Sequence, residues 1–231
     1  MPTSKKDFQS IVGQLERFYG QQPPPVTTDP FEMIVLENIA YLVSDEKRYA
    51  AFEALLNRVG LSAEAIVAAS DEELLECTEL GGMLAGARVN KLRTIAQITL
   101  REFEGDLKGV LKQQPSQAKK ALRQFPGIGA PGAEKILLFS RTQTILALES
   151  NGLRVMVRLG FGEEQKNYAA TYRSVQEAVK GQMKEEVDWL ITAHQLLRRH
   201  GQELCKRARP MCTQCPIANV CLFYKSPLKR A

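Results

Sequence analysis

The octapeptide Phe125-Pro126-Gly127-Ile128-Gly129-Ala130-Pro131-Gly132 follows one helical pattern and opens into the next. Gly127 and Gly129 permit a tight turn and let another backbone approach closely. Pro131 suits the first turn of the second helix, where its missing N–H group costs no hydrogen bond. The free N–H groups at that helix start, with the helix dipole behind them, can bind a phosphate oxygen. The pattern therefore predicts a hairpin of two helices, either as an ordinary structural turn or as a phosphate-binding one.

Helical periodicity also dominates the rest of the chain. Of its 231 residues, 44% are hydrophobic and 25% are charged, which excludes wholesale disorder. The apolar run 31–43 suits a helix buried on several faces, and Ser70-Asp71-Glu72-Glu73 is a capping-box pattern. Segment 144–148 could be extended, but no other segment offers it a partner strand. The sequence predicts an all-α protein with about ten to twelve helices.

Two breaks in the helical patterns suggest two domains. The stretch Gln21-Gln22-Pro23-Pro24-Pro25 favours an extended linker, and a second boundary lies near residues 141–143. We expect residues 23–143 to form one domain, and residues 1–22 with 144–231 to form the other. No run of eighteen apolar residues is present, and the N-terminus lacks the apolar stretch of a secretory signal. These features predict a cytoplasmic protein without a membrane partner.

The net charge of +5 is concentrated near the C-terminus. Residues 197–231 hold eight Lys or Arg and one acid, a net +7, so the other residues hold 23 basic and 25 acidic groups, a net −2. Clustered cations are typical of proteins that bind polyanions. The loop Lys206-Arg207-Ala208-Arg209-Pro210-Met211, here called the basic finger, carries three of these cations. They could offset negative charge nearby, and they could bind phosphates.

Four cysteines frame this loop. Cys205, Cys212, Cys215 and Cys221 have the spacing C-x6-C-x2-C-x5-C within seventeen residues (205–221). Four thiolates in so short a segment can surround one metal centre, and Cys is the usual ligand of iron–sulfur clusters. Disulfides are less favoured in an intracellular helical protein of this size. Structural zinc is the stronger rival, although four-cysteine zinc sites more often contain two C-x2-C pairs. The remaining cysteine, Cys77, is predicted to be a buried small hydrophobe.

Together, the Pro-Gly-Ile-Gly hairpin and the cysteine loop resemble the endonuclease III branch of the helix-hairpin-helix DNA glycosylases, over residues 30–224. The resemblance implies a six-helix barrel containing the hairpin and a second helical domain that joins the N-terminal helix to the cysteine loop. It implies a 4Fe–4S cluster on the four cysteines. It also implies a monomer that binds double-stranded DNA containing a damaged base in the nucleoid. The implied DNA contacts are Gly127, Ile128, Gly129, Lys206, Arg207 and Arg209.

The resemblance also assigns catalytic positions. Members of this family extrude a damaged nucleotide and cut its N-glycosidic bond, with a carboxylate that is normally Asp beyond the hairpin. Glu149 holds that position here, one methylene longer; alternatively, it only caps the next helix. Bifunctional members add a Lys that forms a Schiff base, but Pro131 holds that position and cannot be a nucleophile. Lys135 lies one turn further along the same helical face, and we interpret it as a surface lysine.

Extrusion also needs side chains that fill the gap in the base stack. Leu42 aligns with a polar residue that family members insert, and Met83 and Leu84, after Gly81-Gly82, resemble a second inserted loop. Apolar side chains suit this task, although Leu42 could equally be a core residue. Tyr41 falls where the base pocket would lie, and its ring could stack on a base.

We therefore expect a monofunctional, endonuclease III-like repair glycosylase acting on an alkylated or deaminated base. The alternative is a non-catalytic binder of damaged or distorted DNA. A redox module would explain the cysteines but not the hairpin.

Overall fold

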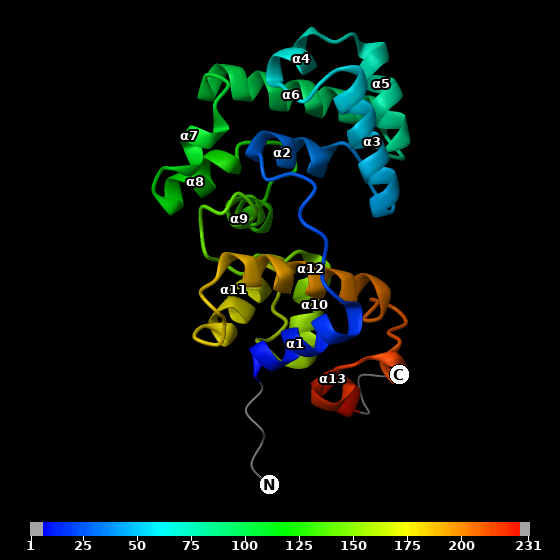
Figure 1. Cartoon of the computed structure of the whole chain (residues 1–231), viewed down its shortest axis with the longest axis vertical. Helices are drawn as coiled ribbons and strands as arrows, with labels where there is room; N and C mark the ends of the chain where they lie inside the picture. Colours follow the sequence, from blue (N-terminus) through cyan, green and yellow to red (C-terminus); the bar gives the residue numbers. More distant parts are fainter. Residues whose placement is uncertain (1–6, 227–231) are drawn as a thin grey trace. The chain divides into compact units, whose positions relative to one another are not determined.

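The computed structural model describes residues 7–226 (Figure 1). Over this range the chain forms thirteen α-helices, two short 3-10 helices and no strand, apart from one isolated bridge between Tyr41 and Gly82. The prediction of an all-α protein is confirmed. The helices outnumber the predicted ten to twelve because several, such as α7 (Leu107–Leu111), are too short to show a periodic pattern. In residues 7–226 no helix is long and apolar enough to cross a membrane.

Contacts along the chain divide it into two compact units. One unit, Pro25–Gln143, contains the hairpin and is called the hairpin unit. The other joins the described residues before Pro25 to those from Thr144 onward, and is called the cysteine unit. From the sequence we expected the first boundary at residue 23, within the proline-rich linker, and the second at residue 143.

Helix α6 organises the hairpin unit, since it contacts α2, α4, α5 and α7. Fully buried aliphatic side chains, among them Ile34, Leu55 and Leu92, form the core between these helices. The predicted capping box at the start of α5 is confirmed, because Ser70 and Glu73 each bond the other's backbone N–H. Besides α7, the helices of this unit are α2 (Pro30–Asn38), α3 (Asp45–Arg58), α4 (Ala63–Ala68), α5 (Asp71–Leu80), α6 (Ala85–Phe103), α8 (Pro115–Leu122) and α9 (Ala130–Phe139).

One predicted helix ends earlier than expected. The apolar run 31–43 was expected to be helical throughout, but α2 stops at Asn38 and residues 39–43 leave the helix. The Asn38 side chain donates to the carbonyl oxygen of Ile34 (2.9 Å) and to that of Pro126 in the hairpin (3.0 Å). The Tyr41 N–H donates to the Gly81 carbonyl oxygen (3.0 Å) instead of continuing the helix. Contacts with two distant segments therefore override the local apolar pattern.

The cysteine unit is built on α12, which packs against α10 and α1. Gly201 in α12 lies so close to α10 that a Cβ there would be 2.7 Å from the Asn151 carbonyl oxygen, so only glycine allows this approach. Phe8 closes the core with edge-to-face contacts to Phe161 and Trp189. The helices of this unit are α1 (Phe8–Tyr19), α10 (Ser150–Leu159), α11 (Tyr168–Val179), α12 (Val187–Glu203), η1 (Cys212–Gln214), η2 (Ala218–Val220) and α13 (Leu222–Lys225).

Candidate nucleic-acid interface and cysteine site

The glycine hairpin joins α8 to α9 through a tight turn. Gly127 has φ +74°, and a Cβ there would lie 2.7 Å from Asn38 Oδ1, so glycine is required on both counts. Ile128 is buried, and its N–H donates to the Phe125 carbonyl oxygen (3.2 Å). Its side chain therefore cannot reach DNA, and the predicted contacts of this turn fall to the exposed backbone of Gly127 and Gly129.

The start of α9 is open to solvent. No side chain of the described residues caps it, and the N-cap Gly129 and the first residue Ala130 are both exposed. Pro131 lies in the first turn, as the sequence predicted. Uncapped N–H groups at the positive end of a helix dipole form a site suited to an anion.

Lys135 is not free on this helix. Its ammonium pairs with Glu37 of α2 (2.5 Å) and lies over the Phe139 ring, 5.7 Å from the ring centroid. An ammonium engaged in an ion pair is not a nucleophile.

Four large apolar side chains are exposed at two loops of the hairpin unit. Leu42 is 78% exposed, Met83 68%, Leu84 65% and Tyr41 51%. The alternative that Leu42 belongs to the core is therefore wrong. These four residues are called the apolar wedge.

Glu149 is the N-cap residue of α10. Its Oε1 accepts the Gly152 N–H (2.6 Å), and its Oε2 accepts the Asn151 side-chain amide (2.8 Å). The capping role considered from the sequence is thus present, and it fixes both carboxylate oxygens on a half-buried side chain.

The extended segment before Glu149 is held by side chains rather than by a sheet. The Leu148 carbonyl oxygen accepts the Tyr168 hydroxyl (3.2 Å), and the Ala147 carbonyl oxygen accepts His194 Nδ1–H (2.8 Å). The Leu146 carbonyl oxygen accepts the Tyr172 hydroxyl (3.4 Å). These bonds satisfy the buried carbonyls without a partner strand and fix the approach to α10.

A chain of hydrogen bonds leads from Glu149 to the cysteine loop, and the sequence did not reveal it. Asn151 Oδ1 accepts Arg154 Nη2–H (2.8 Å), and Arg154 Nε–H donates to the Cys205 carbonyl oxygen (3.0 Å). Burial lowers the pKa of Arg154 from its usual value. Arg154 and Arg158 lie one turn apart on α10, and both face the cysteine loop. This i, i+4 spacing was the one feature of the sequence that could have indicated a shared contact surface on α10.

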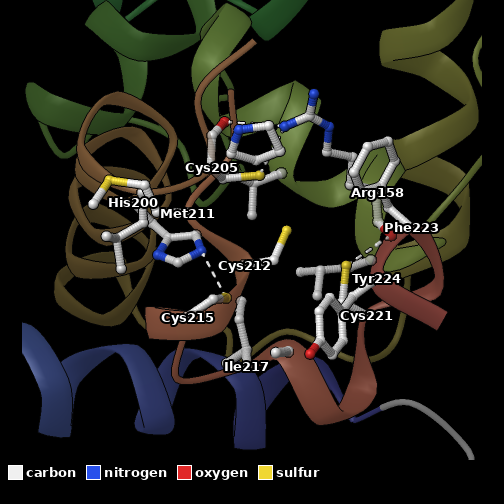
Figure 2. Close-up of a pocket in the computed structure, with 15 residues that line it drawn as sticks. Arg158, His200, Cys205, Met211, Cys212, Cys215, Ile217, Cys221, Phe223 and Tyr224 are labelled. Carbon is white, nitrogen blue, oxygen red and sulfur yellow. Dashed lines mark hydrogen bonds between the residues drawn. The ribbon is translucent and has the colours of Figure 1, made fainter. Parts of the chain in front are cut away.

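The four predicted cysteines surround one pocket (Figure 2). Apolar side chains complete its wall, including Leu159, Leu204 and Ile217. Within residues 7–226, no group of three or more His, Cys, Asp or Glu side chains converges closely enough to hold a single metal ion. A four-iron cluster spreads its thiolates further apart than one ion does, because each thiolate binds a different iron.

Hydrogen-bond donors face these sulfurs, as thiolate ligands require. Arg158 Nη1–H lies 3.3 Å from Cys205 Sγ, and His200 Nε2 lies 3.5 Å from Cys215 Sγ. Burial lowers the pKa of His200 to about 4, so its ring is neutral at pH 7 and carries one proton. With that proton on Nε2, Nδ1 accepts the Tyr19 hydroxyl (3.0 Å). Sequence analysis missed His200, which lies only five residues before the first cysteine of the loop.

Burial favours the protonated thiol at two of the four cysteines. Burial raises the pKa of the Cys215 thiol to about 11, and it raises the pKa of Cys221 as well. The four sulfurs, the donors that face them and the apolar wall fit a metal group bound through thiolates, and binding of such a group displaces the thiol protons.

The backbone of the basic finger is tied down by Arg158. Its guanidinium donates to the carbonyl oxygens of Lys206 (2.8 Å) and Arg207 (2.9 Å). The side chains of Lys206, Arg207 and Arg209 are exposed. A fixed backbone that presents three solvated cations suits the predicted phosphate contact.

Two helical units, one with an uncapped glycine hairpin and one with a four-cysteine loop, define the structural class of the helix-hairpin-helix DNA glycosylases. The chain is 24% identical to Endonuclease III of Sulfolobus acidocaldarius over 205 residues, which cover 88% of this chain and 86% of that protein. The chain is therefore similar to endonuclease III, and its homologues and structural neighbours support a place among the helix-hairpin-helix (HhH-GPD) DNA glycosylases.

Solved structures agree with this fold. An endonuclease III in a non-covalent DNA complex superimposes with a TM-score of 0.73 and 18% identity, covering 98% of this chain and 100% of that one. A thermostable thymine-DNA glycosylase gives a TM-score of 0.74 at 16% identity, covering 94% and 96%. No family model matches the chain.

Proposed function

We propose that the chain is a monofunctional DNA N-glycosylase of base-excision repair that hydrolyses the bond to an extruded alkylated or deaminated base. The observation that carries the proposal is the carboxylate of Glu149, fixed by two hydrogen bonds where the family has Asp, in a chain whose Schiff-base position is Pro131. Relatives named Endonuclease III and Thymine-DNA glycosylase support this class of reaction.

Glu149 would act on the sugar and on water. The base leaves with the electron pair of the N-glycosidic bond and takes up a proton, while the water oxygen bonds to the sugar carbon. The carboxylate offsets the positive charge that develops on the sugar and accepts the proton that the water loses. The product is a free base and an intact abasic strand.

Strand cleavage by a lysine is not part of this proposal. Pro131 has no amine, and the Lys135 ammonium is paired with Glu37 and covers Phe139. A Schiff base needs a neutral amine beside the sugar.

The cofactor we propose is a 4Fe–4S cluster held by Cys205, Cys212, Cys215 and Cys221. The donors at the sulfurs and the apolar wall support a metal centre bound through thiolates, and the C-x6-C-x2-C-x5-C spacing favours a cluster over a single zinc ion. When bound, the cluster would join the four thiolates into one covalent unit and so fix both ends of the basic finger. The protein would act as a monomer on double-stranded DNA containing a damaged base.

One observation favours a second candidate, a non-catalytic binder of damaged or distorted DNA. Both carboxylate oxygens of Glu149 already accept hydrogen bonds from the start of α10. A carboxylate so engaged could serve the helix alone.

The two candidates separate on a panel of single-lesion duplexes that contain uracil, a thymine mismatch, alkylated bases or oxidised bases. We expect strand breaks on at least one alkylated or deaminated lesion, and only in the half of each reaction that is developed in hot alkali. Hydrolysis leaves an abasic strand, which breaks only when alkali is added.

Breaks without alkali would instead assign a nucleophile, and Lys135→Ala would then test whether Lys135 is that group. Tight and selective binding with no product on any lesion would identify the non-catalytic binder. Absence of both binding and product would refute the proposed function.

The basic finger gives a second prediction. Replacing Lys206, Arg207 and Arg209 together by Ala should weaken binding of an undamaged duplex by about tenfold or more at low salt, and should reduce the salt slope by up to about 3. Fluorescence anisotropy titrations at several salt concentrations measure both quantities.

A matched variant separates the finger from net charge. Lys166, Arg173 and Lys184 are exposed cations of the same unit, and their triple Ala variant removes the same charge. We expect this control to retain most of the affinity. Equal losses in the two triple variants would mean that total charge, rather than the finger, governs binding.

A further inference from the structure

The two loops of the apolar wedge form one body. The Tyr41 N–H donates to the Gly81 carbonyl oxygen (3.0 Å), and Tyr41 pairs with Gly82 in the isolated bridge. A Cβ on Gly81 would lie 2.2 Å from the Ile39 carbonyl oxygen, and a Cβ on Gly82 would lie 2.4 Å from Val43 Cγ1. Only glycine allows this approach, so the loops cannot separate without breaking close backbone contacts.

The backbone of the apolar wedge is strained at two leucines. Leu42 has φ +54° and Leu84 has φ +61°, a left-handed conformation that is strained for a non-glycine residue. Such strain persists only where neighbouring structure enforces it. Here it places two leucine side chains in solvent instead of in the core.

Arg88 fixes the loop that carries Met83 and Leu84. It is 3% exposed, and its Nη2 donates to the carbonyl oxygen of Thr78 at the end of α5 (2.7 Å) and to that of Gly82 in the wedge loop. Its Nε and Nη1 have no hydrogen-bond partner. A buried guanidinium bonded only in part is expensive. Its two bonds are those that connect α5, the loop and α6.

The wedge is also fixed relative to the hairpin turn. Asn38, at the end of α2, donates to the Pro126 carbonyl oxygen (3.0 Å), and its Oδ1 lies against Gly127. The wedge loop 39–43 begins directly after Asn38. An anion site at α9 and an exposed apolar tip thus belong to one rigid unit, and duplex DNA is the ligand that offers both phosphates and a base stack.

The resemblance to the glycosylases implies that the apolar wedge fills the place of the extruded nucleotide. We propose that Arg88 is the positioning residue that holds the two loops of the wedge as one preformed body, and that the wedge does not read the base opposite. The proposal rests on the proposed function. Leu42 and Leu84 have no hydrogen-bonding group, and Met83 has only a weak acceptor. Tyr41 carries a hydroxyl that can both donate and accept, so it suits any base. Discrimination between bases needs a fixed pattern of donors and acceptors, and none of these four side chains presents one.

The first test measures binding to duplexes that carry a stable tetrahydrofuran abasic analogue opposite A, C, G or T. We expect the four dissociation constants to agree within about threefold, and each to be at least about tenfold lower than that of the undamaged duplex. Leu42→Gln introduces a donor and an acceptor and should spread the four values to about tenfold. Leu56→Ala removes an exposed leucine of α3 and should change neither quantity.

The second test addresses Arg88 through Arg88→Met and Arg88→Lys, with 2-aminopurine opposite the abasic analogue. Insertion of the wedge should raise the fluorescence of the unstacked 2-aminopurine. Both variants should keep the wild-type helix content and affinity for undamaged DNA. They should lose about tenfold in preference for the abasic duplex, together with most of the fluorescence change.

Each part can be overturned separately from the proposed function. A spread of tenfold or more in the wild-type protein would refute indifference to the opposite base. Unchanged abasic preference in both Arg88 variants would refute its positioning role, and so would unfolding of both, because Arg88 would then serve the core. A protein that binds none of the duplexes would instead remove the proposed function itself.

Discussion

Glu149→Asn is expected to abolish base release, whereas Glu149→Asp should retain part of it. Asp and Asn have the same size, and both are strong N-cap residues, so either can accept the Gly152 N–H in place of Glu149. They differ in the negative charge. A comparison of Glu149→Asp with Glu149→Asn therefore removes the carboxylate while leaving the helix cap in place.

The expected magnitudes follow from the role of the group. A positioned general base contributes about 10²–10⁴-fold, and a displacement of about 1 Å can cost about 10²-fold. The order of single-turnover rates should be Glu149, then Asp, then Asn, with Asp above Asn by at least about tenfold. Glu149→Gln should resemble Asn in rate. It should also lose stability, because one of its amide hydrogens faces the Asn151 amide, whose oxygen already binds Arg154.

Thermal melting provides the control for this series. The Asp and Asn variants should melt within a few degrees of each other, since their caps differ by less than about 1 kcal/mol. Equal rates for Asp and Asn would show that position 149 acts only as a cap. A Gln variant with wild-type activity would contradict the catalytic role directly.

The sequence suggested the capping role of Glu149 as an alternative. It did not predict the hydrogen bond from the Asn151 side-chain amide to the second carboxylate oxygen. N-capping is local: it needs only residue 149 and the backbone three residues on. The bonds from Asn151 through Arg154 to Cys205 span more than fifty residues. Helical spacing on α10 shows that Arg154 and Arg158 share a face, but only the fold shows which loop that face meets.

The end of α2 likewise depends on long-range contacts that the local sequence does not show. Residues 31–43 are apolar, and apolar character alone favours a long buried helix. The chain instead leaves the helix after Asn38, because the Gly81 carbonyl, some forty residues away, accepts the Tyr41 N–H. The sequence places Gly81 and Gly82 only before a loop, whereas the structure shows that they are required for contact with residues 39–43. Arg88 was unpredictable for the same reason, since its partners are backbone carbonyls.

The cysteine loop was the most predictable feature because its chemistry is encoded in spacing alone. Four thiols within seventeen residues can reach one another in almost any fold, and the structure gathers them around one pocket. The neighbours of the sulfurs come from α10 and α12, and so were not predictable. They include Arg158 at Cys205 and His200 at Cys215.

Loss of one cysteine ligand is expected to remove the cluster and with it much of the DNA affinity. Purified wild-type protein should be brown and contain about four iron atoms and four sulfides per chain, whereas Cys215→Ser should be colourless. Metal-centred sites contribute several kcal/mol to the folds they hold, so the melting temperature of Cys215→Ser should fall by about 10 °C or more. Cys77→Ala is the control, because Cys77 is buried in the hairpin unit and does not line the pocket, so its loss should leave the iron content unchanged. A colourless wild-type protein with one zinc would overturn the cluster assignment.

The link between the cluster and the basic finger can be tested by combining variants. If the cluster acts on DNA only by fixing the finger, then removing the finger cations in the Cys215→Ser background should cost little further affinity. The two losses should therefore be strongly non-additive in anisotropy titrations. Additive losses would mean that the cluster supports DNA binding by another route. One such route is the series of hydrogen bonds from Cys205 through Arg154 and Asn151 to Glu149. In that case Cys215→Ser would slow base release even at saturating DNA.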